Sequence, residues 1–188
     1  MTTISENADT FCRMVEARSG EHREAMRVAL DEDWLAIAGS VLRMELDSMM
    51  RVIWLLHHSD TREQILASCV AGKGFKEASG KRIYDRDMAA DAASGNRWVQ
   101  AVYDFGNTFV HLTNAHDYAV RDPFQAYEHR REVIKFLNEF HPGKVPGGPV
   151  DDSSTLRDLA AYAPYVLEKI TSRLDGYVRD LREQCVRR

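Results

Sequence analysis

Hydrophobic residues recur at intervals of three and four along most of the chain, and this spacing marks one face of an α-helix. The pattern is clearest over residues 40–58 and 97–118, and no run alternates between polar and apolar residues as a strand does. The sequence therefore predicts an all-α fold, in which these two segments form long central helices packed against each other. Their apolar positions are Leu42, Leu46, Met49, Ile53 and Leu56, followed by Trp98, Val102, Phe105, Phe109 and Leu112.

Glycine and proline gather in two segments, 71–82 and 141–153, which are predicted to be loops. After the second loop, Asp152, Ser153 or Ser154 can cap a last helix with apolar positions from Leu156 to Leu181, kinked at Pro164. The whole chain, 1–188, is expected to form a single domain, an antiparallel helical bundle. Further helices are expected over residues 5–18, 21–38, 60–70 and 124–140.

Charge and composition narrow the class of protein. The net charge is −4 and the basic residues are scattered, which argues against a broad nucleic-acid surface but leaves room for a small RNA site. The three cysteines share no metal-ligand spacing and are interpreted as reduced thiols. The longest apolar run, Val52–Leu56, is far shorter than a membrane span, and the first residues show no signal-peptide pattern. We expect a soluble, cytoplasmic protein without membrane contact.

The segment from Trp98 to Val120 contains no Lys, Arg or Glu, although polar residues recur through it. Its short polar side chains are poor helix formers, so they are unusual on an exposed helix face. Their spacing predicts one polar stripe that faces an inner cleft or a partner, either as a ligand site or as a hydrogen-bonded layer that fixes helix register. Gly106, in mid-helix, indicates a close approach of a ligand or another helix. The stripe consists of Gln100, Asp104, Asn107, His111 and Asn114.

The segment 40–58 carries charged residues of two kinds. Glu45 lies among apolar residues, and a buried carboxylate requires a partner. Arg43, Asp47 and Arg51 are spaced four apart. They form either a solvated ladder of ion pairs along the helix or an arrangement in which Arg51 or Arg43 reaches toward the His111 stripe.

Several kinds of chemistry are disfavoured. His111 and His116 are five residues apart, so they cannot both bind one metal ion from an unbroken helix. The glycines and lysines of GKGFKEASGKR lack the spacing of a phosphate-binding loop, and no nucleophile elbow is present. The sequence predicts neither a metal site nor a cofactor.

The segment GNTFVH, residues 106–111, resembles the motif of the HEPN superfamily (higher eukaryotes and prokaryotes nucleotide-binding domains). That motif is an arginine, a polar residue such as asparagine, a spacer and a histidine. Asn107 and His111 match it, whereas Gly106 occupies the position of the arginine. The preceding segment RMELDSMMRVIWLL is similar to the early helix of HEPN-like families that bears an acidic residue, and the resemblance covers roughly residues 35–140.

The resemblance implies an α-helical bundle that is commonly a homodimer, and in many members a metal-independent ribonuclease of bacterial toxin–antitoxin or antiphage systems. It implies that His111 and Asn107 act on RNA or a nucleotide, with Arg51 of the facing helix as a replacement arginine. Without one, the chain is expected to bind and not to cut. The alternative is a structural or regulatory module for a protein partner, such as one encoded in the same operon. The expected binding residues are Glu45, Asp104, Asn114, His116 and Asp117.

Overall fold

The computed structural model describes residues 3–77, 79–111, 116–140 and 149–186, and these residues form α-helices without a strand. The all-α prediction is confirmed. In chain order the helices are α1 (Ile4–Asp31), α2 (Leu35–His57), α3 (Arg62–Val70), α4 (Asp85–Gly95), α5 (Trp98–Val110), α6 (Arg130–Phe140), α7 (Leu156–Ala160) and α8 (Ala163–Val186).

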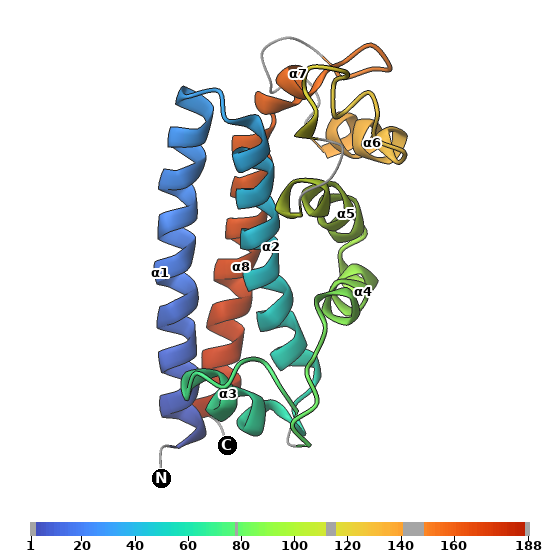
Figure 1. The fold of residues 1–188 in the computed structure, drawn as a ribbon. Coiled ribbons are helices and arrows are strands. Elements are labelled where there is room, and N and C mark those ends of the chain that lie inside the picture. Colours follow the sequence, from blue (N-terminus) through green and yellow to red (C-terminus); the bar gives the residue numbers. More distant parts are fainter. Residues whose placement is uncertain (1–2, 78, 112–115, 141–148, 187–188) are drawn as a thin grey trace.

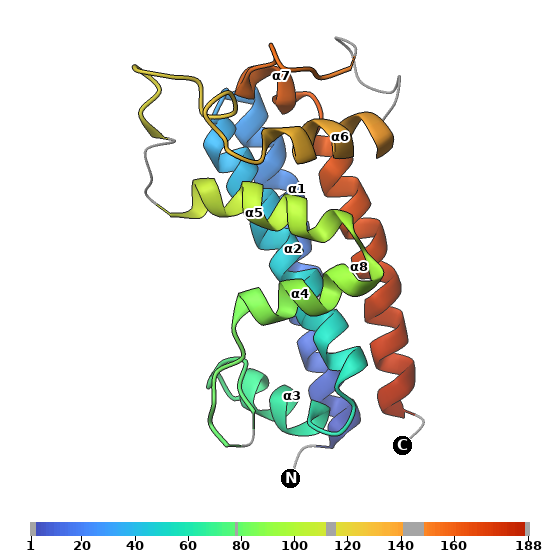
Figure 2. The same ribbon diagram turned by 90° about the vertical axis from the view of Figure 1, so that its right-hand side faces the viewer.

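Three long helices, α1, α2 and α8, run side by side and contact one another along the length of the molecule (Figure 1). On one side of this bundle, α4, α5 and α6 run across the long helices (Figure 2). The short helix α3 lies at the end where α1 begins and α8 ends. The core fills the space between these layers, and Leu46, Met49, Ile170 and Leu181 are among its fully buried side chains.

The first helix is continuous where the sequence predicted two. Thr3 and Glu6 form a capping box at its start, and Gly20, at the expected break, lies inside the helix. The chain instead turns after Asp31, where Asp33 has a positive φ of 60°. Aspartate tolerates this left-handed conformation better than most residues. The predicted boundaries at 18, 21 and 38 are therefore wrong, and the change of direction comes just before α2.

The predicted central helix over 97–118 is shorter than expected. It packs against α2 as predicted, but it ends at Val110, and His111 has an extended backbone with φ −106° and ψ 144°. The residues that follow include asparagine and histidine, which compete with the helical backbone for hydrogen bonds. Asn114, the last member of the predicted stripe, lies outside the described residues.

Other boundaries also differ from the prediction. The helix expected from residue 124 begins at Arg130, because Asp122 Oδ1 instead accepts hydrogen bonds from the backbone of Phe124 and Gln125 in a turn. Pro164 does not kink a helix: it lies in the first turn of α8, where proline is tolerated. Helix α4 was not anticipated. The glycines of the loop before it, Gly72, Gly74 and Gly80, all have positive φ.

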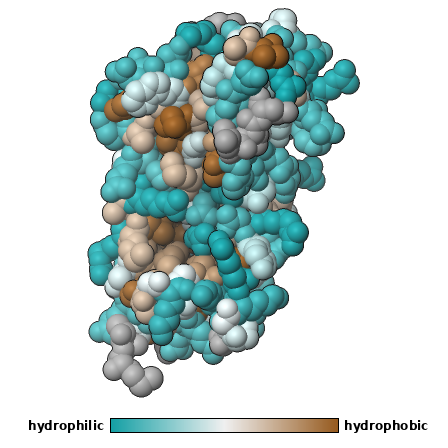
Figure 3. Space-filling model, in the orientation of Figure 1, coloured by the Kyte–Doolittle hydropathy of each residue, from teal (hydrophilic) through white to brown (hydrophobic). Residues whose placement is uncertain are grey.

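No helix within the described part of the chain is both long enough and apolar enough to cross a membrane. On the face shown in Figure 3, hydrophilic residues cover most of the surface and hydrophobic residues gather in separate small groups.

Candidate functional site

The polar stripe of α5 divides between two neighbours. Gln100 and Asp104 lie on a cleft of about 470 Å³ between α5 and α6, where Gln100 Nε2 donates to Asp104 Oδ1 at 2.9 Å. Asn107 turns toward α2 and accepts a hydrogen bond from Arg43 Nε at 2.9 Å. The two parts of the stripe therefore lie in different surroundings, and they do not line one continuous site.

Helix α5 crosses α2 at very short distance, and a glycine on each helix permits this approach. A β-carbon at Gly106 would lie 2.6 Å from Arg43 Cβ, and one at Gly39 would lie 2.6 Å from a ring carbon of Phe109. Helix α2 thus places Arg43 directly against Gly106, next to Asn107. An arginine from α2 therefore lies next to Asn107, although the residue that precedes Asn107 in the sequence is a glycine.

The Arg43 guanidinium is held on several sides. Besides Asn107, it donates from Nη2 to Asp85 Oδ2 at 3.2 Å, and its Cζ lies 4.4 Å from the centroid of the Tyr103 ring. The residue is only 6% exposed. Such a guanidinium is well satisfied by a carboxylate, an amide and an aromatic face. Two of its three guanidinium nitrogens, Nε and Nη2, are therefore already engaged.

Arg43 belongs to a group of charged side chains that we call the arginine network. Asp47 lies at its centre and accepts hydrogen bonds from Arg18 Nη1 at 3.1 Å and from Arg51 Nε at 2.9 Å. Arg51 Nη2 also lies 3.5 Å from Asp85 Oδ1. The interpretation of these charges as a solvated ladder is wrong, because Arg43 and Asp47 are buried. The network consists of Arg18, Arg43, Asp47, Arg51 and Asp85.

The charges of the network stabilise one another against burial. Burial disfavours the ionised carboxylate of Asp47, but hydrogen bonds and charge from Arg51 and Arg18 outweigh it and hold its pKa below the usual value. Burial likewise opposes the charge on Arg51, and Asp47 more than offsets this effect, so the pKa of Arg51 is raised. Arg51 therefore points to Asp47 and Asp85, and Arg43 is the arginine that contacts the α5 stripe.

Glu45 has the partners that its apolar surroundings require, but they come from α1. Ser19 Oγ donates to Oε1, and His22 Nδ1 lies 2.6 Å from Oε2. The Glu45 carboxylate is fully buried, and both of its oxygens are occupied. It therefore contacts α1, whereas Asn107 contacts α2 through Arg43.

His111 is exposed at the C-terminal end of α5. Among the described residues it makes no hydrogen bond with Glu45, Asn107, Arg43 or Arg51. Within the described residues, Arg43 thus contacts the stripe at Asn107 and not at His111.

Residues 116–118 form a partly exposed surface with two aromatic rings. His116 is half-buried, with its ring centroid 6.4 Å from that of Phe109 and 6.3 Å from that of Tyr118. Tyr118 is more than half exposed, and Asp117 is also exposed. An imidazole can hydrogen-bond a phosphate. An exposed phenol ring beside it can stack on a base.

The cleft around Asp104 has a mixed charge. Arg97 and Lys135 line it together with Asp104, Glu132 and Glu139. Burial raises the pKa of nearby Tyr127, and the negative charge of Asp104 adds to that shift. Tyr127 is therefore a neutral hydrogen-bonding group at physiological pH. Within the described residues, no group of three or more His, Cys, Asp or Glu side chains is arranged to hold a metal ion.

Sequence reasoning missed several partners of the predicted residues. Ser19 and His22 continue the buried face of α1 that includes Phe11, Val15 and Met26, and two polar residues on an apolar face were a usable signal for a partner of Glu45. Asp85 and Tyr103 gave no comparable signal, because their contact with Arg43 depends on how α4 and α5 cross α2.

Replacing Gly106 with alanine tests the close crossing. Gly106→Ala is expected to lower the free energy of unfolding by about 1–2 kcal/mol, because its β-carbon would force Arg43 and the two helices apart. Gly20→Ala in α1 is the matched control: its β-carbon would meet no atom within 4 Å, and the variant should be about 0.5–1 kcal/mol more stable than the wild type. Urea unfolding followed by circular dichroism measures both. If Gly106→Ala stabilised the protein as much as Gly20→Ala does, the close approach of α5 to α2 would be contradicted.

Comparisons with protein-family models, with curated proteins and with solved structures found no match to this chain.

Proposed function

We propose that the protein is a HEPN-like helical module that binds RNA or a nucleotide at the end of α5, and that it does not cut RNA with an arginine–histidine pair. The observation that carries the proposal is the contact of Arg43 with Gly106 and Asn107. Gly106 is the position at which the HEPN motif has its arginine. An arginine from the facing helix is thus adjacent to that position, although the replacement expected from the sequence was Arg51.

The surroundings of Arg43 support binding without cleavage. Cleavage of a phosphodiester requires positive charge that is free to act on the phosphate as it becomes more negative. The Arg43 guanidinium is buried and already engaged with Asp85, Asn107 and Tyr103. To reach a phosphate it would have to break these contacts at the crossing of α2 and α5. His111, by contrast, is exposed and can hydrogen-bond a phosphate or a ribose hydroxyl directly.

The expected ligand is small. A net charge of −4 opposes binding to a long polyanion, so few phosphates can be neutralised and the affinity should fall only modestly with added salt. The exposed ring of Tyr118 offers a stacking surface for one base. These features favour a mononucleotide or a short single-stranded RNA. The proposal includes the homodimer common among HEPN-like bundles, in which a second copy would cover the exposed side chains of Val110 and Val120.

Binding of a fluorescein-labelled RNA hexamer and of a labelled ATP analogue, measured by fluorescence anisotropy at low salt, tests the proposal. His111→Ala should weaken binding at least about tenfold while changing the free energy of unfolding by less than about 0.5 kcal/mol, because His111 is exposed. His57→Ala, at the far end of α2, is the matched control and should bind like the wild type. Light scattering on the same samples measures the mass of the assembly.

Two results would overturn the proposal. The first is a wild type that binds neither probe even when the protein is in large molar excess over the probe. The second is cleavage of the labelled RNA that disappears in His111→Ala, because this would identify an enzyme and not a binding module.

A structural or regulatory module for a protein partner is the second candidate. The specific observation in its favour is that Asn107 accepts its hydrogen bond from Arg43, so that part of the polar stripe fixes the register of α5 on α2. A module of this kind should bind neither nucleotide probe, and the wild type and His111→Ala should then give the same anisotropy.

A further inference from the structure

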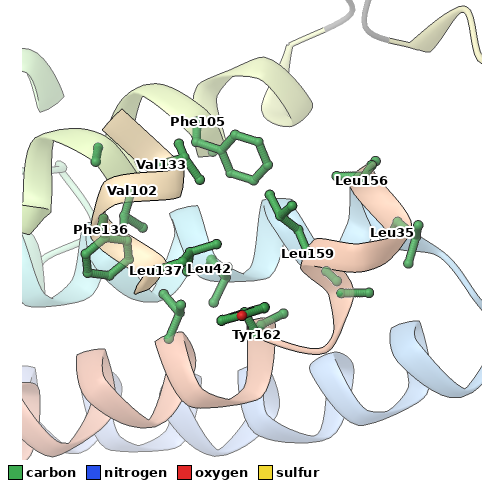
Figure 4. A pocket seen from close by; sticks show the side chains of 17 residues that line it. Leu35, Leu42, Val102, Phe105, Val133, Phe136, Leu137, Leu156, Leu159 and Tyr162 are labelled. Atoms are coloured by element: carbon green, nitrogen blue, oxygen red, sulfur yellow. The ribbon is translucent and has the colours of Figure 1, made fainter. Parts of the chain in front are cut away.

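An apolar cavity lies where α5, α6 and α7 meet α2 and α8 (Figure 4). It has about 50 Å³ of space in which the centre of a water molecule could lie, more than one water molecule requires. Seventeen residues line it, and none of them carries a charge. Phe105 and Phe136 form part of its wall on one side, and Leu42, Leu159 and Tyr162 do so on the other.

The cavity follows from the close crossing of α2 and α5. Gly39 and Gly106 both line it, and neither position can accept a β-carbon without displacing Phe109 or Arg43. The crossing thus requires residues without side chains at two places on the wall. Protein interiors normally fill such space to the density of an organic crystal. Here the neighbouring wall residues Ala38 and Ala163 are also small, so the space stays open.

The lining determines what the space can hold. A charged or strongly polar molecule would lose its hydration there and gain no charged partner, which is costly. An uncharged apolar molecule would remove its own surface from water and regain the dispersion contacts that the wall now lacks. The wall residues Leu35, Phe105 and Ala160 are only half-buried, so the cavity lies near the molecular surface on their side.

We propose that this cavity is a binding site for one small uncharged apolar molecule, of the size and chemistry of a substituted benzene. The inference goes beyond the nucleotide site proposed above and does not depend on it. The cavity is lined by the apolar face of α5, whereas His111 lies past the end of that helix.

Thermal unfolding with toluene as the probe tests the site. Near-saturating toluene should raise the midpoint of wild-type unfolding by about 2–4 °C, because a ligand that binds only the folded state stabilises it. Benzoate, which has the same ring with a charged group, should give no shift. Ala160→Leu adds a side chain to the wall and should remove the toluene shift. Ala90→Leu on the exposed face of α4 is the matched control and should keep it.

A second variant covers the case in which Ala160→Leu does not fold. Leu137→Ala enlarges the cavity, so naphthalene should raise its unfolding midpoint and leave that of the wild type unchanged. Fluorine NMR of fluorobenzene gives an independent reading, with line broadening expected for the wild type and Ala90→Leu only. The proposal is overturned if toluene does not shift the wild type, or if benzoate shifts the wild type as much as toluene does.

Discussion

Replacing Arg62 with methionine is expected to lower the free energy of unfolding by about 3–4 kcal/mol, the largest effect that we predict for one residue. Arg62 is 1% exposed, and its partners are mainly backbone carbonyls. Its Nε donates to Leu55 O at 2.6 Å, and its Nη2 donates to Leu56 O at 3.1 Å and to Gln184 Oε1 at 2.7 Å. Methionine would fill much of the volume but supply no donor.

The effect is large because Arg62 completes the end of α2. The last carbonyls of a helix have no partner within the helix, and the C-terminal end carries partial negative charge that favours a cation. Arg62 satisfies two of these carbonyls and, through Gln184, ties the end of α2 to α8. Removing it leaves buried carbonyls unpaired.

Thermal and urea unfolding measure this loss, with an expected fall in the thermal midpoint of about 10 °C for a chain of this length. Arg62→Lys keeps the charge but loses the planar fork, so it should fall between the wild type and Arg62→Met. Arg86→Met in α4 is the control, because the Arg86 side chain is 83% exposed. An Arg62→Met protein as stable as Arg86→Met would contradict the capping role.

The periodicity of apolar residues was sufficient to predict the fold class because it depends only on local spacing. It was insufficient for the ends of the helices. Gly20 is tolerated inside α1, and the chain turns instead at Asp33, where a single left-handed residue decides the geometry. The end of α5 at Val110 was also not visible in the apolar spacing, which continues to Leu112.

The candidate site could be predicted only in part, because its geometry depends on contacts between distant helices. The need of Glu45 for a partner followed from its apolar neighbours, but Ser19 and His22 are more than twenty residues away in sequence. Charges spaced four apart have the same pattern on a solvated face and on a buried one. Whether Arg43 is exposed is decided by the crossing of α5 over α2, which the sequence near Arg43 does not encode.

The second large effect is expected at Asp47, the carboxylate at the centre of the arginine network. Asp47→Asn should lower the free energy of unfolding by about 2–3 kcal/mol at pH 7, because it leaves Arg51 and Arg18 without their shared negative charge. This is less than the loss for a fully buried pair, since the Arg18 side chain is 40% exposed and can turn to water.

The effect should depend on pH in one direction. The pKa of Asp47 is lower in the folded protein than its usual value of 3.8, so its contribution to stability is fully present above about pH 5 and is lost as the pH falls through the folded-state pKa. The stability of the wild type should therefore fall toward that of Asp47→Asn as the pH is lowered below about 5. Urea unfolding of both proteins between pH 3 and pH 7 measures the difference.

A double-mutant cycle separates the ion pair from other effects of the substitution. If Asp47 acts mainly through Arg51, Asp47→Asn and Arg51→Met together should cost less than the sum of the single changes, by about 1–2 kcal/mol at pH 7. Asp180→Asn, at an exposed position of α8, should be within about 0.5 kcal/mol of the wild type at every pH. Additive single changes, or a difference between wild type and Asp47→Asn that does not shrink in acid, would show that Asp47 stabilises the fold by packing and not by its charge.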